Sequence, residues 1–276
     1  MAFHIAIAGD FNTGKSFSRK PIINGEECFL ITPTAKASHL FTSEGKPVKR
    51  LEFKTENNPS TRDLIKRIWK EEAPKKKVTD LMKYLMKTPD KAASITVEGN
   101  YVVATLEQVS TILRYISDYM PHIKNVFIGD FTHFLTHILA SSEFIERKQG
   151  GEAYQRFWEL AGQVVRDLIE SSNDLREDMV IITEYHTAYD EVAGLQRVFV
   201  PGGQMLTEKF KLESYYDYML CTMVEMDEKS KRPSRYAFVT ERYGQYNARF
   251  SNIFEDVVIP NDMQLVLSKF REYVGI

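Results

Sequence analysis

Short apolar runs recur along the chain, separated by stretches in which apolar residues repeat every three or four positions. Each run is long enough for one buried β-strand, and Gly9 and Pro33 close the first two. The runs cover residues 3–8, 27–32, 101–104, 125–130, 179–184, 218–226 and 235–240. Only a polar turn separates the last two runs, so we expect them to form an antiparallel hairpin at one edge of the sheet.

Two stretches between the runs have helical periodicity. The apolar residues of 106–116 fall on one helix face, and Thr105 and Gln108 form a capping box at its start. The same spacing runs through residues 157–168. Strands that alternate with amphipathic helices predict an α/β fold, with a mainly parallel sheet covered by helices on both faces.

Residues 60–92 have a helical pattern throughout and are unusually basic. They hold ten Lys and Arg residues against five acidic ones, and Pro74 divides them into two expected helices. We interpret the segment as a small basic helical insertion within a single domain that spans residues 1–276. Its cations form either a solvated face or a contact with a nucleic-acid backbone.

The overall composition is that of an ordinary globular protein, with 43% hydrophobic and 27% charged residues and a net charge of −2. No apolar stretch is long enough to span a membrane, and the N-terminus lacks the pattern of a signal peptide. Cys28 and Cys221 lie in apolar contexts far apart, which favours buried free thiols over a disulfide. We therefore expect a cytoplasmic protein that does not contact a membrane.

The first apolar run leads into the sequence GDFNTGKS, which satisfies the phosphate-binding pattern GxxxxGK[ST] in full. Glycines let such a loop turn its backbone N–H groups toward phosphate oxygens, and the following helix N-terminus adds a partial positive charge. Lys15 is expected to reach the β- and γ-phosphates of a bound nucleotide, and the Ser16 hydroxyl to bind Mg²⁺. The expected nucleotide contacts are Gly9, Asp10, Phe11, Asn12, Thr13, Gly14, Lys15, Ser16 and Phe17.

A carboxylate on the Mg²⁺ side should follow another strand, because ligands gather at the carboxyl edge of a parallel sheet. Asp130, which closes VFIGD, fits this role, and Gly129 before it is expected to be sterically harmless. If the strand that ends near Glu184 lies between the first strand and that of Asp130, then Thr183, Glu184 and His186 are candidate sensor or water-orienting groups. The alternative is that these residues have ordinary structural roles.

Other catalytic and metal-binding patterns are missing from the sequence. It contains no CxxC, HExxH or GxSxG motif, and no GxGxxG after a strand, which disfavours a dinucleotide-binding fold. His133 and His137 have the spacing of two ligands on one helix, but no third ligand accompanies them, so we do not interpret them as a metal site.

The order of several blocks resembles a known family. The blocks are GDFNTGKS, VFIGD, ITEYHT, PGGQMLTEKFKLESYYDYMLCTMVE and FVTERYGQYNARF. Across most of residues 1–260 the chain is similar to the phage-encoded, core-only RecA-like P-loop ATPases linked to single-strand annealing and homologous recombination. The resemblance implies ATP and Mg²⁺ binding, ATP hydrolysis, and homo-oligomerisation into rings or filaments. It also implies association with single-stranded DNA and a single-strand DNA-binding protein in the host cytoplasm, during recombination, annealing or replication.

The family pattern maps onto the glycine-rich motif and onto Asp130 as the acid on the Mg²⁺ side. It also suggests that Arg242 or Arg249, on the late hairpin, reaches the γ-phosphate of a neighbouring subunit. The family usually has a glutamate after its second strand as general base, but residues 31–36 (ITPTAK) contain no acid. Either Glu184 or another group orients the water, or turnover is slow.

Two further stretches are candidates for contact with single-stranded DNA, because they combine cations with glycines or an aromatic residue. They are residues 146–151 and 196–199. Two other functions stay open: a nucleotide-gated assembly protein with weak hydrolysis, and a small-molecule or nucleotide kinase. The missing glutamate favours the assembly protein over the kinase. A kinase also needs an arginine-rich lid over the phosphate acceptor, and the arginines available for such a lid are scattered.

Overall fold

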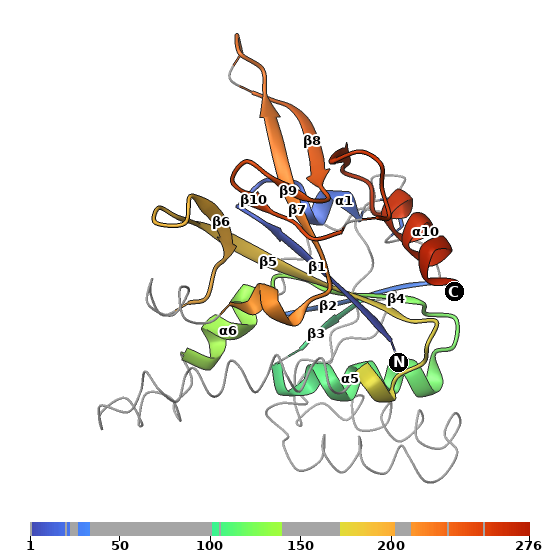
Figure 1. Cartoon of the computed structure of the whole chain (residues 1–276). Coiled ribbons are helices and arrows are strands. Elements are labelled where there is room, and N and C mark those ends of the chain that lie inside the picture. Colours follow the sequence, from blue (N-terminus) through green and yellow to red (C-terminus); the bar gives the residue numbers. More distant parts are fainter. Residues whose placement is uncertain are drawn as a thin grey trace.

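The computed structural model describes residues 2–19, 21–22, 27–33, 101–104, 106–139, 172–201, 211–230, 232–250 and 252–276. Within these ranges the protein is a mixed α/β structure around one large sheet (Figure 1). The strands are β1 Phe3–Gly9, β2 Cys28–Thr32, β3 Tyr101–Val103, β4 Asn125–Ile128, β5 Val180–Asp190, β6 Leu195–Val198, β7 Tyr218–Met226, β8 Pro233–Val239, β9 Arg242–Tyr243, β10 Tyr246–Asn247 and β11 Val258–Pro260. The α-helices are α1 Lys15–Ser18, α5 Leu106–Tyr119, α6 Phe131–Leu139 and α10 Met263–Val274, with 3₁₀ turns at Ser172–Asp174 and Leu212–Tyr215.

The main sheet has the strand order β11-β8-β7-β1-β5-β4-β2-β3, and β6 pairs with β5 outside this path. The neighbours from β7 across to β3 run parallel, whereas β8 is antiparallel to β7 and β11 is antiparallel to β8. The expected parallel sheet and the C-terminal antiparallel hairpin are both confirmed. Strands β9 and β10 form a separate two-stranded hairpin.

Hydrophobic clusters lie on both faces of this sheet, as the alternation along β1 requires. Ala6 belongs to one cluster, together with Leu113 of α5 and Phe134 of α6. The next residue, Ile7, belongs to the other cluster, together with Phe270 of α10. Figure 1 accordingly shows α5 and α10 on opposite sides of the sheet. The expectation that helices cover both faces is confirmed for the described helices.

The position of strand β1 in the sheet determines which residues surround the candidate binding site. It lies between β5 and β7, although the chain passes from β1 to the distant β2 before it returns. Register pairs Gly9 with His186 and Ile7 with Glu184, so the end of β1 lies level with the segment after Glu184. In addition, β5 lies between β1 and β4, which is the arrangement that brings the expected site residues together.

Some expectations need correction or fall outside the described residues. Strand β5 does not end near Glu184 but continues to Asp190, where it turns back into β6. Helix α10 was not expected, although Asp262 caps it and Gly275 ends it in the left-handed conformation. The expected helix at 157–168, the Thr105 cap, the basic insertion at 60–92 and the stretch 146–151 lie outside the described residues.

Both cysteines are buried free thiols, as the sequence indicated. Burial raises the pKa of Cys28 to about 11 and that of Cys221 to about 12, so neither is a reactive thiolate at neutral pH. None of the helices in the described ranges has the length and apolar character to cross a membrane.

Candidate functional site

A glycine loop, residues 9–16, connects β1 to the short helix α1. Two of its residues, Asn12 and Gly14, have a positive φ, at 59° and 94°. A β-carbon on Gly9 would lie 1.7 Å from Oγ1 of Thr222. One on Gly14 would lie 3.0 Å from the ring of Tyr236. Both glycines are therefore required by close contacts with the C-terminal strands, and Gly14 also by its backbone conformation.

Lys15 folds back over this loop. Its Nζ donates hydrogen bonds to the carbonyl oxygens of Gly9, at 2.6 Å, and Asp10, at 2.7 Å. It also lies 3.3 Å from Nδ1 of His186. Burial lowers the pKa of Lys15 to about 8, and the negative charges of Glu184, Asp130 and Asp10 offset part of that effect. The amine thus stands at the carboxyl edge of β1 with several acceptors around it.

Asp130 follows β4 directly and adopts a left-handed conformation, with φ of 52°. Its Oδ1 lies 3.2 Å from Nε2 of His186, and its Oδ2 lies 3.8 Å from Nδ1 of His133. Burial raises the pKa of Asp130, but His186, His133 and Lys15 lower it further, so the net pKa is below its usual value. The carboxylate is therefore held in its charged form.

His186 joins these two groups into a row that we call the Lys15–His186–Asp130 cluster. The ring of Phe11, itself 71% exposed, stacks on the imidazole with centroids 4.1 Å apart. The backbone N–H of His186 donates to Oγ1 of Thr132 at 3.0 Å. The strand order β1-β5-β4 meets the condition set for His186 as a candidate, and it places the His186 ring beside Lys15. The cluster contains one cation and one carboxylate, each within hydrogen-bonding range of the imidazole between them.

Glu184 has a different environment from the one we expected. It is 3% exposed, and its Oε1 accepts a hydrogen bond from Nη1 of Arg19 at 2.7 Å. A carboxylate that is buried and paired with a guanidinium is poorly placed to activate water. This geometry argues against the water-orienting role. Thr183 is fully buried beside Tyr216, where it cannot meet a phosphate.

The expectation that Gly129 is sterically harmless also needs correction, because a side chain at this position would lie too close to its neighbours. A β-carbon there would lie 3.2 Å from Nη1 of Arg19, 3.3 Å from Leu30 and 3.6 Å from Oε2 of Glu184. The glycine therefore leaves room for the Arg19–Glu184 ion pair. Sequence reasoning missed Arg19, although it follows Lys15 by four residues, which is the spacing that places two residues on the same side of a helix.

The donor set at the carboxyl edge fits Mg²⁺ in part. Asp130 Oδ1 is buried and lacks a well-directed hydrogen bond, and the side chain of Ser16 is exposed at the start of α1. Oxygen atoms of this kind are the ligands that Mg²⁺ takes, with phosphate and water completing its shell. Within the described ranges no three His, Cys, Asp or Glu side chains converge on a metal position.

The remaining candidate residues have other partners or surroundings. Arg242 is exposed on β9, whereas the backbone of Arg249 bridges to Met219 on β7. The Arg249 guanidinium donates to the carbonyl oxygen of Tyr216 at 3.4 Å. The stretch 196–199 is not an open loop but largely strand β6, and Arg197 there pairs with Asp190 at 2.8 Å. Phe17 is 57% exposed, with its ring tilted toward that of Tyr236.

Comparison with known proteins does not identify the function of this site, which is therefore inferred from its geometry. No protein-family model matches the chain, and no curated protein matches it either.

Proposed function

We propose that the chain is a RecA-like P-loop ATPase that binds ATP with Mg²⁺ through residues 9–17 and Asp130, and that acts on single-stranded DNA. The observation that carries this proposal is the Lys15–His186–Asp130 cluster directly behind a complete GxxxxGK[ST] sequence. Ligands of open α/β sheets bind outside the carboxyl ends of parallel strands, where chain connections diverge to either side. Strand β1 has such a position, between β5 and β7.

Each residue of the loop then has a specific task. The Lys15 amine exchanges its bonds to Gly9 and Asp10 for bonds to the β- and γ-phosphate oxygens, which are stronger acceptors because they are charged. Backbone N–H groups of the loop bind the β-phosphate. Ser16 and Asp130 would hold Mg²⁺, which when bound neutralises charge that develops on the transferring phosphoryl group. Asp130 suits this role because its lowered pKa keeps it ionised.

We assign the orientation of the attacking water to His186 rather than to Glu184. The imidazole lies between the amine that meets the γ-phosphate and the carboxylate on the metal side. Once the Lys15 amine has turned to the phosphates, Nδ1 can accept a hydrogen bond or a proton from water, while Nε2 faces Asp130. Glu184 is then a positioning residue, because its bond to Arg19 fixes α1, which begins with Lys15, against β5.

A second function is favoured by a specific observation. Residues 31–33, which end β2 and directly follow it, contain no acid, and Glu184 is already paired with Arg19. A site of this kind supports nucleotide binding better than fast hydrolysis. The second candidate is therefore a nucleotide-gated assembly protein, in which ATP drives the formation of rings or filaments and is hydrolysed slowly.

The test combines nucleotide binding with phosphate release. Lys15→Ala should abolish binding of ATP and Mg²⁺ in calorimetry while the circular dichroism spectrum stays unchanged, because the amine supplies the cation at the phosphates. Lys269→Ala, on the exposed face of α10, is the matched control and should bind normally. Phosphate release stimulated by single-stranded DNA supports the ATPase, and ATP binding with little release supports the assembly protein. Unchanged ATP affinity in Lys15→Ala contradicts both.

A further inference from the structure

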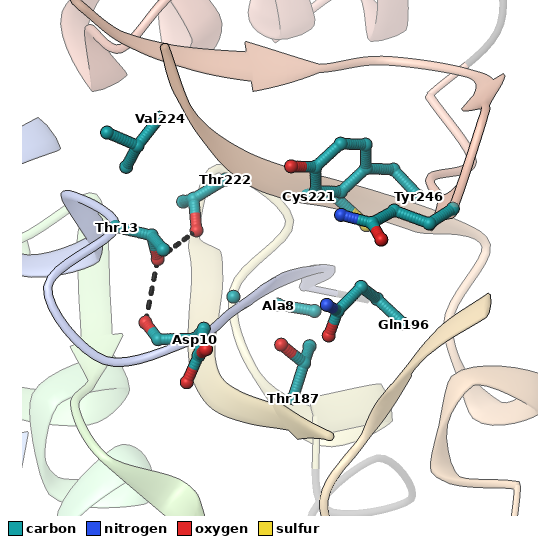
Figure 2. Close-up of a pocket in the computed structure, with 11 residues that line it drawn as sticks. Ala8, Asp10, Thr13, Thr187, Gln196, Cys221, Thr222, Val224 and Tyr246 are labelled. Atoms are coloured by element: carbon teal, nitrogen blue, oxygen red, sulfur yellow. Dashed lines mark hydrogen bonds between the residues drawn. The ribbon is translucent and has the colours of Figure 1, made fainter. Parts of the chain in front are cut away.

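A cavity of about 160 Å³ lies beside the glycine loop (Figure 2). Three parts of the molecule surround it: the glycine loop with β7, the β5–β6 hairpin, and the β9–β10 hairpin. Figure 2 shows Thr187 and Gln196 on one side of the cavity and Tyr246 across from them. The two hairpins are tied together here, because the backbone N–H of Gln196 donates to the carbonyl oxygen of Gln245 at 2.7 Å.

The lining selects a neutral, planar and hydrogen-bonding ligand. Gln196 and Gln245 contribute amides, Thr187 a hydroxyl and Tyr246 an aromatic ring. Among the described residues that line the cavity there is no Lys or Arg, and the Asp10 carboxylate repels phosphate. Side-chain amides pair with the donor and acceptor edge of a base, and an aromatic ring stacks on its face. The volume is below the range of roughly 300–1,000 Å³ typical of whole-ligand pockets, so it suits one ring system.

We propose that this cavity binds one nucleobase of a single strand, an inference that rests on the proposed function for its DNA partner. The surroundings of the cavity support a strand as the source of the base. Tyr189 on β5 and Tyr243 on β9 are each 53% exposed and offer two further ring faces on the same two hairpins.

The position of the cavity connects base binding to the glycine loop. Thr13 lines it, and the Thr13 hydroxyl donates to the carbonyl oxygen of Asp10 at 2.7 Å. The same hydroxyl shares a hydrogen bond with that of Thr222, which also lines the cavity (Figure 2). A base in the cavity therefore touches the bonds that shape the loop. By linkage, the base changes the affinity for ATP by the same factor by which ATP changes the affinity for the strand.

The direct test compares two strands in the absence of ATP. Fluorescence anisotropy measures the affinity for a short oligothymidylate and for an abasic deoxyribose-phosphate chain of the same length. The natural protein should prefer the oligothymidylate by about ten-fold, the size of one stacked and hydrogen-bonded base. The double variant Gln196→Ala/Gln245→Ala should lose most of this preference and keep its affinity for the abasic chain. Gln264→Ala, an exposed glutamine on α10, is the matched control and should keep the preference.

Two further measurements distinguish a failure of this inference from a failure of the proposed function. Lys15→Ala should keep the preference for bases although it no longer binds ATP, because the lysine does not line the cavity. Calorimetry with ATP and with inorganic tripolyphosphate tests the other source of a base. If the double variant loses only its preference for ATP over tripolyphosphate, the base belongs to the bound nucleotide and the strand assignment is overturned. An unchanged preference for oligothymidylate in a correctly folded double variant also overturns it.

Discussion

At Gly9 a single hydrogen atom stands where any side chain would collide with Thr222. We predict that Gly9→Ala lowers the free energy of unfolding by about 1–3 kcal/mol, the usual cost of overpacking a tight site, and weakens ATP binding as the loop shifts. Thr222→Ala removes the nearest atom, so the double variant Gly9→Ala/Thr222→Ala should recover part of the loss. Urea unfolding of the two single variants and the double variant measures this coupling. Strictly additive losses would mean that the contact does not shape the loop.

Because Lys15 is titratable, we predict that raising the pH increases its contribution to stability but weakens ATP binding. Burial lowers its pKa in the folded protein to about 8, whereas an unfolded chain keeps about 10.5. Between these values the unfolded state binds more protons, so the contribution of Lys15 to the free energy of unfolding rises with pH. The affinity for ATP should fall over the same range, because the neutral amine no longer attracts phosphate.

Denaturant unfolding and calorimetry at pH values on both sides of 8 measure the two trends. ATP itself is fully ionised in this range, so its charge does not contribute. In Lys15→Ala the rise in stability attributed to the lysine should be absent. An ATP affinity that stays constant up to pH 10 would contradict a buried, phosphate-binding amine.

At the scale of elements, the Arg19–Glu184 ion pair connects α1 to β5. Both side chains are almost fully buried, at 8% and 3% exposed. We predict that Arg19→Met or Glu184→Leu alone lowers the free energy of unfolding by about 3–5 kcal/mol, because each leaves an unpaired buried charge. The double variant should lose less than either single variant. Thermal and urea unfolding of the three variants provide the measurement, and a double variant with the summed loss would mean that the two groups act independently.

The sequence predicts those parts of the elements and of the site whose signals are local. The glycine loop is a contiguous pattern after an apolar run, and Asp130 closes another such run, so both could be located before the structure. The role of His186 depended on which strands are neighbours, and that pairing joins residues far apart in the chain. Arg19 could not be matched with Glu184 for the same reason. Helix α10 is different, since Asp262 and Gly275 are recognisable start and stop signals that could have predicted it.

Strand β6 could not have been predicted in this way. Two of its four residues, LQRV, are polar, so their composition does not predict a strand. They are extended because they pair with β5. The continuation of β5 to Asp190 has the same cause, because the polar segment after His186 has a partner only in β6. Pairing between neighbouring strands therefore overrides the local composition on this side of the sheet.

At the scale of the whole molecule, Arg242 is the better candidate for a cation given to a neighbouring subunit. Its side chain is exposed, whereas the guanidinium of Arg249 already bonds to Tyr216 within its own subunit. We predict that Arg242→Ala and Lys15→Ala subunits are each inactive alone but release phosphate when mixed, because adjacent pairs rebuild a complete site. A cation supplied in trans is worth roughly 10³–10⁵ in rate in well-studied GTPases.

The matched mixture contains Arg249→Ala in place of Arg242→Ala. Since we expect Arg249 to act within its own subunit, this mixture should not regain activity beyond that of its components. Light scattering confirms that mixed oligomers form in both cases. An inactive mixture of Arg242→Ala and Lys15→Ala, with oligomers present, would mean that the site is complete within one subunit.

The position of β1 in the sheet also has a consequence for the synthesis of the chain. The strand leaves the ribosome well before both of its neighbours, β5 from Val180 and β7 from Tyr218. Until then the nascent chain carries the glycine-rich motif without the strands that shape it, and Gly9 lacks its contact with Thr222. On the proposed function, a chain interrupted before β7 would not assemble its nucleotide site. Nucleotide loading would then be restricted to chains whose C-terminal strands have already been made.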